Sequence, residues 1–349
     1  MLEALLRDIT ATEIITFARA VQTEASYVLT GNVMPERQIN GVKYKTRRTS
    51  RRVNAAKYRA YDAQTPIASR EVKQIETEGQ LPPLGQKYLV GELETILLAV
   101  RRGQDASELV ELLFDDVAAH TKSIRSRLEL AVGDLLTDGK FTLTGENGLT
   151  VEYDAGVPSA NMPTASVPWT DPTSDPLADE QAWLETLRAS GAPMPEKVLT
   201  SYKARALLAG NDAYRAAYYG STNPSNTPTA TLAPNEVQAV RARYNLPPIE
   251  IYDVQIPKDD NTMVRPIPED RWVMVPPNRQ QWGETQYGIT AESIALTTGD
   301  NPAIELEEAP GIIVTHGWQD DPVQVWTKGS AVAMPVLYVP DIHITAKVF

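Results

Sequence analysis

The sequence predicts an α+β protein that is organised around one long helix. Apolar residues recur at helical spacing from residue 105 to residue 138. Residues 140–154 then alternate between apolar and polar side chains around a turn, which is typical of a β-hairpin. Beyond residue 176 short helical patterns alternate with strand patterns, and the chain returns to strands at its end. These three observations indicate a mixed fold of class α+β.

The long helix has a clear beginning and end in the sequence. Asp105 and Glu108 form a capping-box pattern, and Gly139 suits the left-handed residue that follows a helix. Its apolar face comprises Leu109, Leu113, Val117, Ile124, Leu128, Val132 and Leu135, with Val110, Ala118, Ala131 and Leu136 beside them. At about 1.5 Å per residue this helix is expected to be on the order of 50 Å long. In the hairpin that follows, Asn147-Gly148 supplies a turn with positive φ. One hairpin is too small to cover the helix, so the remaining cover must come from later strands or from another subunit.

Four elements are expected before the long helix. Residues 9–25 form a short amphipathic helix, and residues 42–46 alternate as a strand. Residues 62–85 look like a two-stranded excursion, with one strand at 67–72, a second near Ile75 and a return at the double proline of residues 82–83. Residues 86–102 are predicted to form a second helix, because their apolar residues fit one helical face.

After the hairpin, the segment 158–176 is rich in Pro, Ser, Thr and Asp and is the expected domain boundary. Helices are predicted at 179–190, 203–219 and 234–244. Strands are predicted at 197–202, 249–256, 263–267, 271–275, 311–315, 323–328, 331–339 and 342–348. No internal repeat is present.

Composition excludes several classes of protein. The 349 residues include no Cys, which removes disulfides, thiolate zinc sites and cysteine nucleophiles. The first residues carry acids and no basic region, unlike a secretory signal, and no apolar run reaches the roughly 20 residues of a membrane span. We therefore expect a soluble cytoplasmic protein with no membrane partner. The formal net charge of −12 has the opposite sign to that of a tight nucleic-acid binder.

The charge is uneven, because one segment is strongly basic. Its basic residues are Arg37, Lys43, Lys45, Arg47, Arg48, Arg51, Arg52, Lys57 and Arg59. They contribute +9 with no acid among them, which leaves −21 for the rest of the chain. The segment could be a solvated loop, or it could bind nucleic acid through interleaved tyrosines such as Tyr44 and Tyr58. The hypothesis we favour is that these nine residues contact the acidic body of a neighbouring subunit.

Few residues suggest catalysis or metal binding. His120, His316 and His343 have no second His at ligand spacing, so structural roles are expected. Acidic pairs occur at 115–116, 259–260, 307–308 and 320–321, but adjacent side chains point in different directions. No nucleophile elbow, phosphate loop or dinucleotide-binding motif is present. We expect no catalytic, cofactor-binding or metal residues. A two-domain hydrolase that uses Asp171 and His316 is the contrasting hypothesis.

Several motifs resemble the major capsid protein E family of tailed phages, in the family's order. The most specific is GKFTLTG at 139–145, where the long helix enters the hairpin. The others are YRAYDAQTPI at 58–67, VEYDAG at 151–156, IPEDRWVMV at 267–275, GETQYG at 283–288, DDPVQVWTK at 320–328 and AMPVLYVPD at 333–341. The resemblance spans nearly the whole chain.

This resemblance implies the Hong Kong 97-like capsid fold. Residues 1–34 would be its N-terminal arm, and residues 35–83 its extended loop over a neighbouring subunit. Residues 84–160 would be the peripheral domain with the spine helix and hairpin. Residues 161–290 would be the axial domain, and residues 291–349 would return as strands to the peripheral domain.

The resemblance also implies a function and partners. The chain would be a major capsid protein, not an enzyme, whose hundreds of copies form hexamers and pentamers of an icosahedral virion shell around double-stranded DNA. Assembly in the host cytoplasm, a separate scaffolding protein and a portal are expected, a decoration protein is plausible, and DNA would be contacted weakly and non-specifically. A bacterial protein nanocompartment of the same fold is the nearest alternative.

Overall fold

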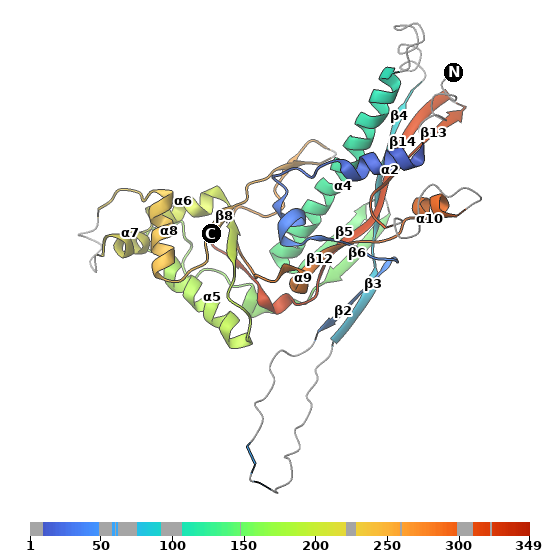
Figure 1. Cartoon of the computed structure of the whole chain (residues 1–349). Coiled ribbons are helices and arrows are strands. Elements are labelled where there is room, and N and C mark those ends of the chain that lie inside the picture. Colours follow the sequence, from blue (N-terminus) through green and yellow to red (C-terminus); the bar gives the residue numbers. More distant parts are fainter. Residues whose placement is uncertain are drawn as a thin grey trace.

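The computed structural model describes residues 10–48, 58–59, 61, 75–91, 107–146, 148–220, 228–258, 260–298, 310–321 and 323–349. Figure 1 shows a long helix, α4, that runs diagonally through the molecule. One sheet lies along this helix, and a second sheet with four helices forms the opposite end. In the part of the chain that is described, no helix is both long and apolar enough to cross a bilayer.

Helix α4, Ser107–Asp138, confirms the predicted long helix. Gly139 follows it with a φ of 76°, as the left-handed cap requires. Leu113, Val117, Ile124 and Leu128 lie in the core that α4 forms with the neighbouring sheet. Val132, Leu135 and Leu136 continue the same stripe into a second core cluster. The expected capping pattern at Asp105 lies outside the described residues.

The sheet along α4 supplies the cover that the sequence required. Its strands run in the order β1-β12-β14-β13, and β4 pairs with the same strand β14. They are β1 Glu36–Gln38, β4 Pro83–Val90, β12 Gly283–Tyr287, β13 Ile313–Asp320 and β14 Val323–Leu337. Helix α2, Ala11–Ala20, packs against both α4 and β13, and Thr10 and Glu13 close its capping box. The two strands expected at 323–328 and 331–339 are thus one long strand.

The prediction of a helix at 86–102 is wrong for residues 86–90, which the structure describes as a strand. Gln86 to Val90 belong to β4, and residues 92–102 lie outside the described residues. The burial of β4 alternates, with Tyr88 turned toward α4 and Leu89 exposed. Pairing along the whole of β4 with β14 therefore overrides the local helical spacing.

The second sheet has the order β15-β11-β7-β8 and is surrounded by helices. Its elements are β7 Lys197–Thr200, β8 Ile249–Ile251, β11 Arg271–Val275, β15 Ile344–Lys347, α5 Pro176–Ser190, α6 Tyr202–Gly210, α7 Asp212–Tyr219 and α8 Pro234–Arg243. The single helix expected at 203–219 is two helices. Asn211 separates them because its side-chain oxygen accepts hydrogen bonds from the first amides of α7.

The remaining elements connect these layers. They are η1 Leu29–Val33, β2 Lys43–Arg48, β3 Ile75–Gln80, β5 Lys140–Glu146, β6 Leu149–Asp154, η2 Ser159–Asn161, β9 Ile256–Pro257, β10 Met263–Val264, α9 Arg279–Trp282, α10 Ala291–Thr297 and η5 Pro340–Ile342. Strands β5 and β6 confirm the predicted hairpin, and Gly148 has the expected positive φ of 82°. The strand predicted at 67–72 lies outside the described residues.

The sheets do not follow the expected division of the chain at residue 290. Strand β12 precedes this position but pairs with β14 in the sheet along α4. Strand β15 follows it but pairs with β11 in the second sheet. The chain therefore crosses between the two sheets in both directions, because buried strands pair with the neighbours that complete each core rather than with their sequence neighbours.

A buried ion pair holds the second sheet to its helices. Both nitrogen ends of the Arg241 guanidinium bond to Glu180, at 2.6 and 2.9 Å, and both side chains are fully buried. Tyr214 and Trp272 add hydrogen bonds to this pair. The pair thus joins α5, α7, α8 and β11 at one point.

His343 makes the stability of the fold sensitive to acid. Its Nδ1 accepts a hydrogen bond of 3.2 Å from Trp282, and burial lowers the pKa of His343 to about 4. The unfolded chain therefore binds more protons than the folded chain between about pH 6.5 and 4, so stability is lost as pH falls. We expect a loss of about 3 kcal/mol over this window. Urea unfolding at several pH values should show a flatter profile for His343→Gln, and an unchanged slope would contradict this assignment.

Candidate assembly surface

The hairpin of β2 and β3 projects from the body of the molecule (Figure 1). It forms an antiparallel pair with Lys43 opposite Gln80 and Arg48 opposite Ile75. Tyr44 anchors its base, because its ring lies edge-on to Tyr153 at 5.3 Å between ring centres. Gly79 leaves room for this ring, since a Cβ there would lie 2.5 Å from the Tyr44 hydroxyl. The base of the projection is therefore fixed to the core.

The predicted contact residues are distributed unevenly over this region. Lys43 and Lys45 lie on the exposed face of β2, and Lys45 pairs with Glu76 on β3 at 3.1 Å. Arg37 lies on β1 and pairs with Glu284 of its own chain at 3.1 Å. Arg59 is exposed. Arg47 and Arg48 lie on β2, and the structure describes only their backbone. Arg51, Arg52 and Lys57 lie outside the described residues.

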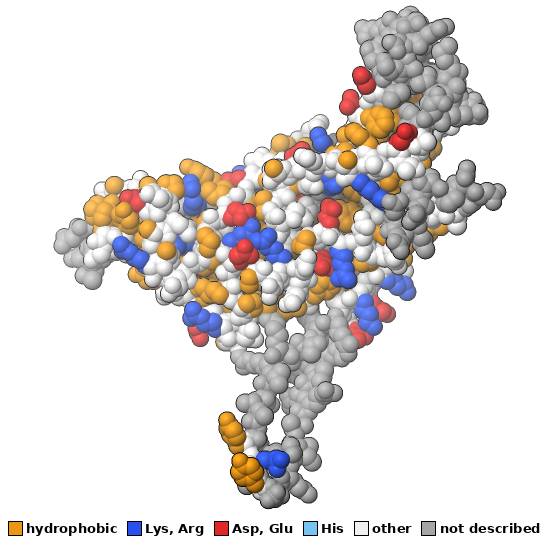
Figure 2. All heavy atoms as spheres, in the orientation of Figure 1, with side chains coloured by type: hydrophobic (Ala, Val, Ile, Leu, Met, Phe, Trp, Pro, Cys, Tyr) orange, Lys and Arg blue, Asp and Glu red, His pale blue; other side chains and the backbone are white. Residues whose placement is uncertain are grey.

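Charges of both signs are mixed over the described surface of the body. On the face that Figure 2 shows, Lys and Arg side chains lie among Asp and Glu side chains across the body. Tyr58 and Tyr61 are fully exposed, beside the exposed Arg59. Large exposed aromatic side chains next to a cation are typical of a surface that another protein covers.

Glu129 ties the N-terminal arm to the long helix. Although it is fully buried, its carboxylate accepts hydrogen bonds from the Leu29 amide, from the amide and hydroxyl of Thr30, and from the Tyr252 hydroxyl, at 2.7–2.9 Å. Burial and then the neighbouring Glu129 raise the pKa of Tyr252, which therefore remains a donor. The carboxylate thus joins three segments that are distant in sequence.

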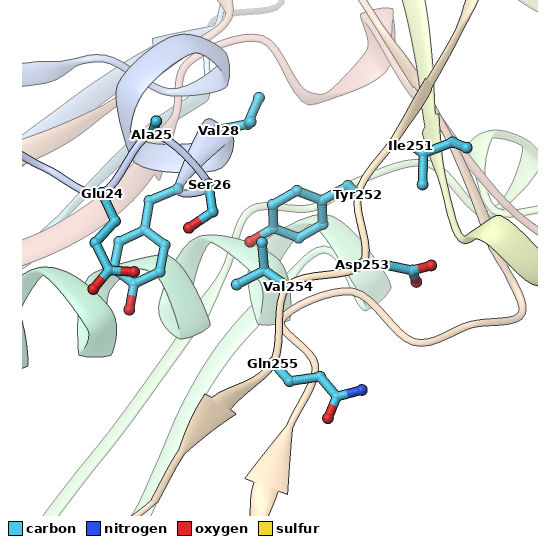
Figure 3. A pocket seen from close by; sticks show the side chains of 10 residues that line it. Glu24, Ala25, Ser26, Val28, Ile251, Tyr252, Asp253, Val254 and Gln255 are labelled. Atoms are coloured by element: carbon cyan, nitrogen blue, oxygen red, sulfur yellow. The ribbon is translucent and has the colours of Figure 1, made fainter.

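A cleft lies beside this junction, as Figure 3 shows. It is lined by residues 24–28 of the arm and by residues 251–255, which begin at the last residue of β8. Tyr27 bonds to Ser126 of α4 at 2.7 Å, and Asp253 forms an ion pair with Arg265. Tyr27 and Asp253 thus hold the arm and the loop to the body.

The three histidines have packing contacts that support structural roles. His120 is buried in α4, stacks on Tyr88 at 4.3 Å and bonds to Thr327 of β14 at 3.0 Å. Burial lowers the pKa of His120 despite the nearby Asp116. His343 packs against Trp282, and His316 lies on β13. These contacts fix α4 and the two sheets.

The acidic residues singled out in the sequence have local partners. Asp171 accepts hydrogen bonds of 2.9 and 2.8 Å from the amide and hydroxyl of Thr173, which lower the pKa of Asp171. Asp260 closes a similar turn with Thr262. Among the described residues, no three acids or histidines are grouped as a metal site would require. Asp171 is thus a turn residue.

The structure combines one long helix packed against a sheet, a projecting hairpin and a second sheet at the far end. The chain matches a candidate prophage capsid protein from E. coli CFT073 with a TM-score of 0.61 and 14% identity, over 98% of this chain and 99% of that one. A phage-related protein from Bordetella bronchiseptica RB50 matches with a TM-score of 0.54 and 13% identity, over 96% of this chain and 95% of that one. The fold is the Hong Kong 97-like capsid fold.

The family model "Phage major capsid protein E" matches residues 10–348. The chain therefore belongs to the phage major capsid protein E family, and the resemblance seen in the motifs is confirmed. No curated protein sequence matches it. Membership of this family implies a structural role in a shell of many copies and a place in the virion.

Two features of the structure were missed from the sequence. Glu129 interrupts the apolar stripe of α4 between Leu128 and Val132, and a charged residue at a core position is a signal for a buried partner. Strand β4 was missed because a helix was predicted at 86–102. The burial of β4 alternates, with Leu84, Gln86 and Tyr88 less exposed than their neighbours, but this alternation is visible only once β4 is paired with β14.

Proposed function

We propose that the chain is the major subunit of a phage head, in which hexamers and pentamers of this protein form an icosahedral shell around double-stranded DNA. The observation that carries the proposal is the fit of the whole chain, from arm to last strand, to one capsid family. The charge supports it as well, because a net charge of −12 avoids tight binding to packaged DNA. Contact with DNA is then weak and non-specific.

In this proposal each region has a place in the shell. The sheet on α4 with the β5–β6 hairpin is the peripheral domain, and the second sheet with α5–α8 is the axial domain at the centre of a capsomer. Residues 1–34 are the arm, and residues 35–83 are the extended loop that reaches a neighbouring subunit. The protein has no catalytic role, assembles in the host cytoplasm, and works with a separate scaffolding protein, a portal and possible decoration proteins that are encoded elsewhere.

The direct test is to express the chain alone and together with the neighbouring phage genes, and then to weigh and image the soluble product. Closed particles of megadalton mass support the proposal. A stable monomer of 38.4 kDa under both conditions, at high concentration and across salt, would overturn it. Particles that carry a protein cargo instead of DNA would favour a nanocompartment.

Charge reversal tests the basic segment as a subunit contact. Replacing Arg47, Arg48, Arg51 and Arg52 with Glu should block assembly while the monomer still folds, because the change places repulsive charges at the proposed contact. We expect at least about a tenfold loss of particles, equivalent to roughly 1.4 kcal/mol, by sedimentation. Replacing the same residues with Lys is the control and should retain most particles. A normal particle yield from the Glu variant would refute the contact.

A further inference from the structure

Strand β4 is paired with β14 along one of its two edges. The Ala333 amide donates to the Pro82 carbonyl at 3.2 Å, so the even-numbered residues of β4 form the hydrogen-bonded pairs with β14. The main-chain groups of Gly85, Lys87 and Leu89 therefore point away from β14. Within the described part of the chain, no main-chain group bonds to these three residues. This edge can accept one further strand.

A groove lies beside this edge, along residues 82–87. Its volume is about 1490 Å³, which exceeds the roughly 300–1,000 Å³ of small-molecule sites. Strands β4 and β14 line one side, and α4, the β5–β6 hairpin and the residues around β9 line the other. Leu130, Leu143 and Leu149 are half-buried on that second side and present apolar surface to the groove. The space suits an extended peptide that lies against both sides.

The charge of the groove is opposite to that of the whole chain. The charged residues that line it are Lys87, Arg127, Lys258, Lys328, Asp260 and Glu292. With four basic and two acidic residues the groove carries +2, although the chain has a net charge of −12.

Both acids of the groove are engaged within the chain. Glu292 forms an ion pair with Lys328, and the Asp260 carboxylate accepts hydrogen bonds from the amide and hydroxyl of Thr262. In contrast, neither Lys87 nor Lys258 forms an ion pair with a carboxylate in the described part of the chain. The groove therefore favours a negatively charged partner.

The two faces of β4 differ in their chemistry. Tyr88 stacks on His120 of α4 at 4.3 Å between ring centres, so the even-numbered side chains of β4 face α4. Lys87 lies on the opposite face, where its ammonium group is 4.7 Å from the centre of the Trp326 ring. A strand added to β4 would place alternate side chains on these two faces. Acidic side chains would meet Lys87, and apolar side chains would meet the leucines on the far side of the groove.

We propose that the open edge of β4 binds an acidic, extended segment of a partner protein, which adds to the sheet as a further strand within the groove. Acidic residues at alternate positions of this segment face Lys87, and the apolar residues between them contact Leu130, Leu143 and Leu149. The chain's own basic segment is a poor occupant, because its nine positive charges meet a groove of the same sign. This inference goes beyond the proposed shell function. It is tested on the soluble chain, so either proposal can fail without the other.

Short peptides test the chemistry of the occupant. The probe is a labelled, acetylated peptide in which Glu and Val alternate. One comparison peptide alternates Lys with Val, and a second has the sequence of residues 43–52. Fluorescence anisotropy with the full chain should show that the Glu–Val peptide binds at least about tenfold more tightly than either basic peptide. Equal or tighter binding of a basic peptide, or no saturable binding of the Glu–Val peptide up to about 1 mM, would overturn the proposal.

Lys87→Glu tests the charge of the groove. This variant should bind the Glu–Val peptide about tenfold more weakly, because it places a like charge opposite an acidic residue of the added strand. Lys122→Glu is the matched control, since Lys122 is exposed on α4 and does not line the groove. Its affinity should stay within about twofold of the unmodified chain. Equal losses from the two variants would show that only the overall charge matters, and would refute the site.

Hydrogen exchange tests whether the peptide adds as a strand. In the free chain the outward amides of Gly85 and Lys87 should exchange fast, whereas the amides of Gln86 and Tyr88 are protected by β14. Saturating Glu–Val peptide should slow exchange at Gly85 and Lys87 by about tenfold or more. Unchanged exchange at these two amides would show that the peptide does not pair with β4. Slow exchange at the same amides in particles of the chain alone would assign the edge to a second copy, and would also overturn the proposal.

Discussion

Arg241→Met is expected to lower the free energy of unfolding by about 3–5 kcal/mol. Arg241 is completely buried, and its guanidinium bonds to Glu180 and to the Pro247 carbonyl. Removing it leaves the Glu180 carboxylate buried without its opposite charge, and such a charge is far more costly than a lost surface contact. Urea unfolding followed by Trp fluorescence reports this region directly, because Trp169, Trp183 and Trp272 lie in the same core.

Arg188→Met is the matched control for this prediction. Arg188 pairs with Glu185 at 3.3 Å, but the two side chains are 62% and 69% exposed, so a change of only about 0–1 kcal/mol is expected. The double variant Glu180→Leu with Arg241→Met should recover part of the loss, because it removes both buried charges. Equal losses from Arg241→Met and Arg188→Met would show that the buried pair does not hold the second sheet to its helices.

The sequence predicts best those elements whose local pattern and final packing agree. The long helix, the hairpin at 140–154 and the helix at 234–244 were found because their spacing, caps and turns all indicate the same structure. The segment 86–90 failed because Tyr88 and Leu89 fit a helical face equally well, and only pairing with β14 decides between the two. Strand β12 was missed because its polar residues Glu284, Thr285 and Gln286 are buried by partners distant in sequence.

The candidate surface could be predicted only in part, for a related physical reason. The basic residues are visible in the sequence as a run of charge, but an ion pair such as Arg37 with Glu284 joins positions 247 apart. The charge pattern therefore predicts a contact, whereas the partner of each charge depends on the three-dimensional fold.

Glu129→Gln is expected to release the N-terminal arm and to cost about 2–4 kcal/mol of stability. The carboxylate accepts four hydrogen bonds, from Leu29, Thr30 and Tyr252, within the core. A glutamine keeps the shape but replaces one acceptor oxygen by an NH₂ group that faces other donors, so two donors lose their acceptor. Hydrogen exchange should show faster exchange in residues 29–33, with α4 less affected.

Glu111→Gln is the control, because Glu111 lies on the same helix with an exposed side chain. Its stability should change by less than about 0.5 kcal/mol. Equal exchange in the two variants would contradict the role of Glu129. Release of the arm while α4 stays folded would show that the Glu129 carboxylate holds the arm, the long helix and the loop at Tyr252 together. A subunit without this carboxylate should then enter particles poorly, because its arm no longer has a fixed direction.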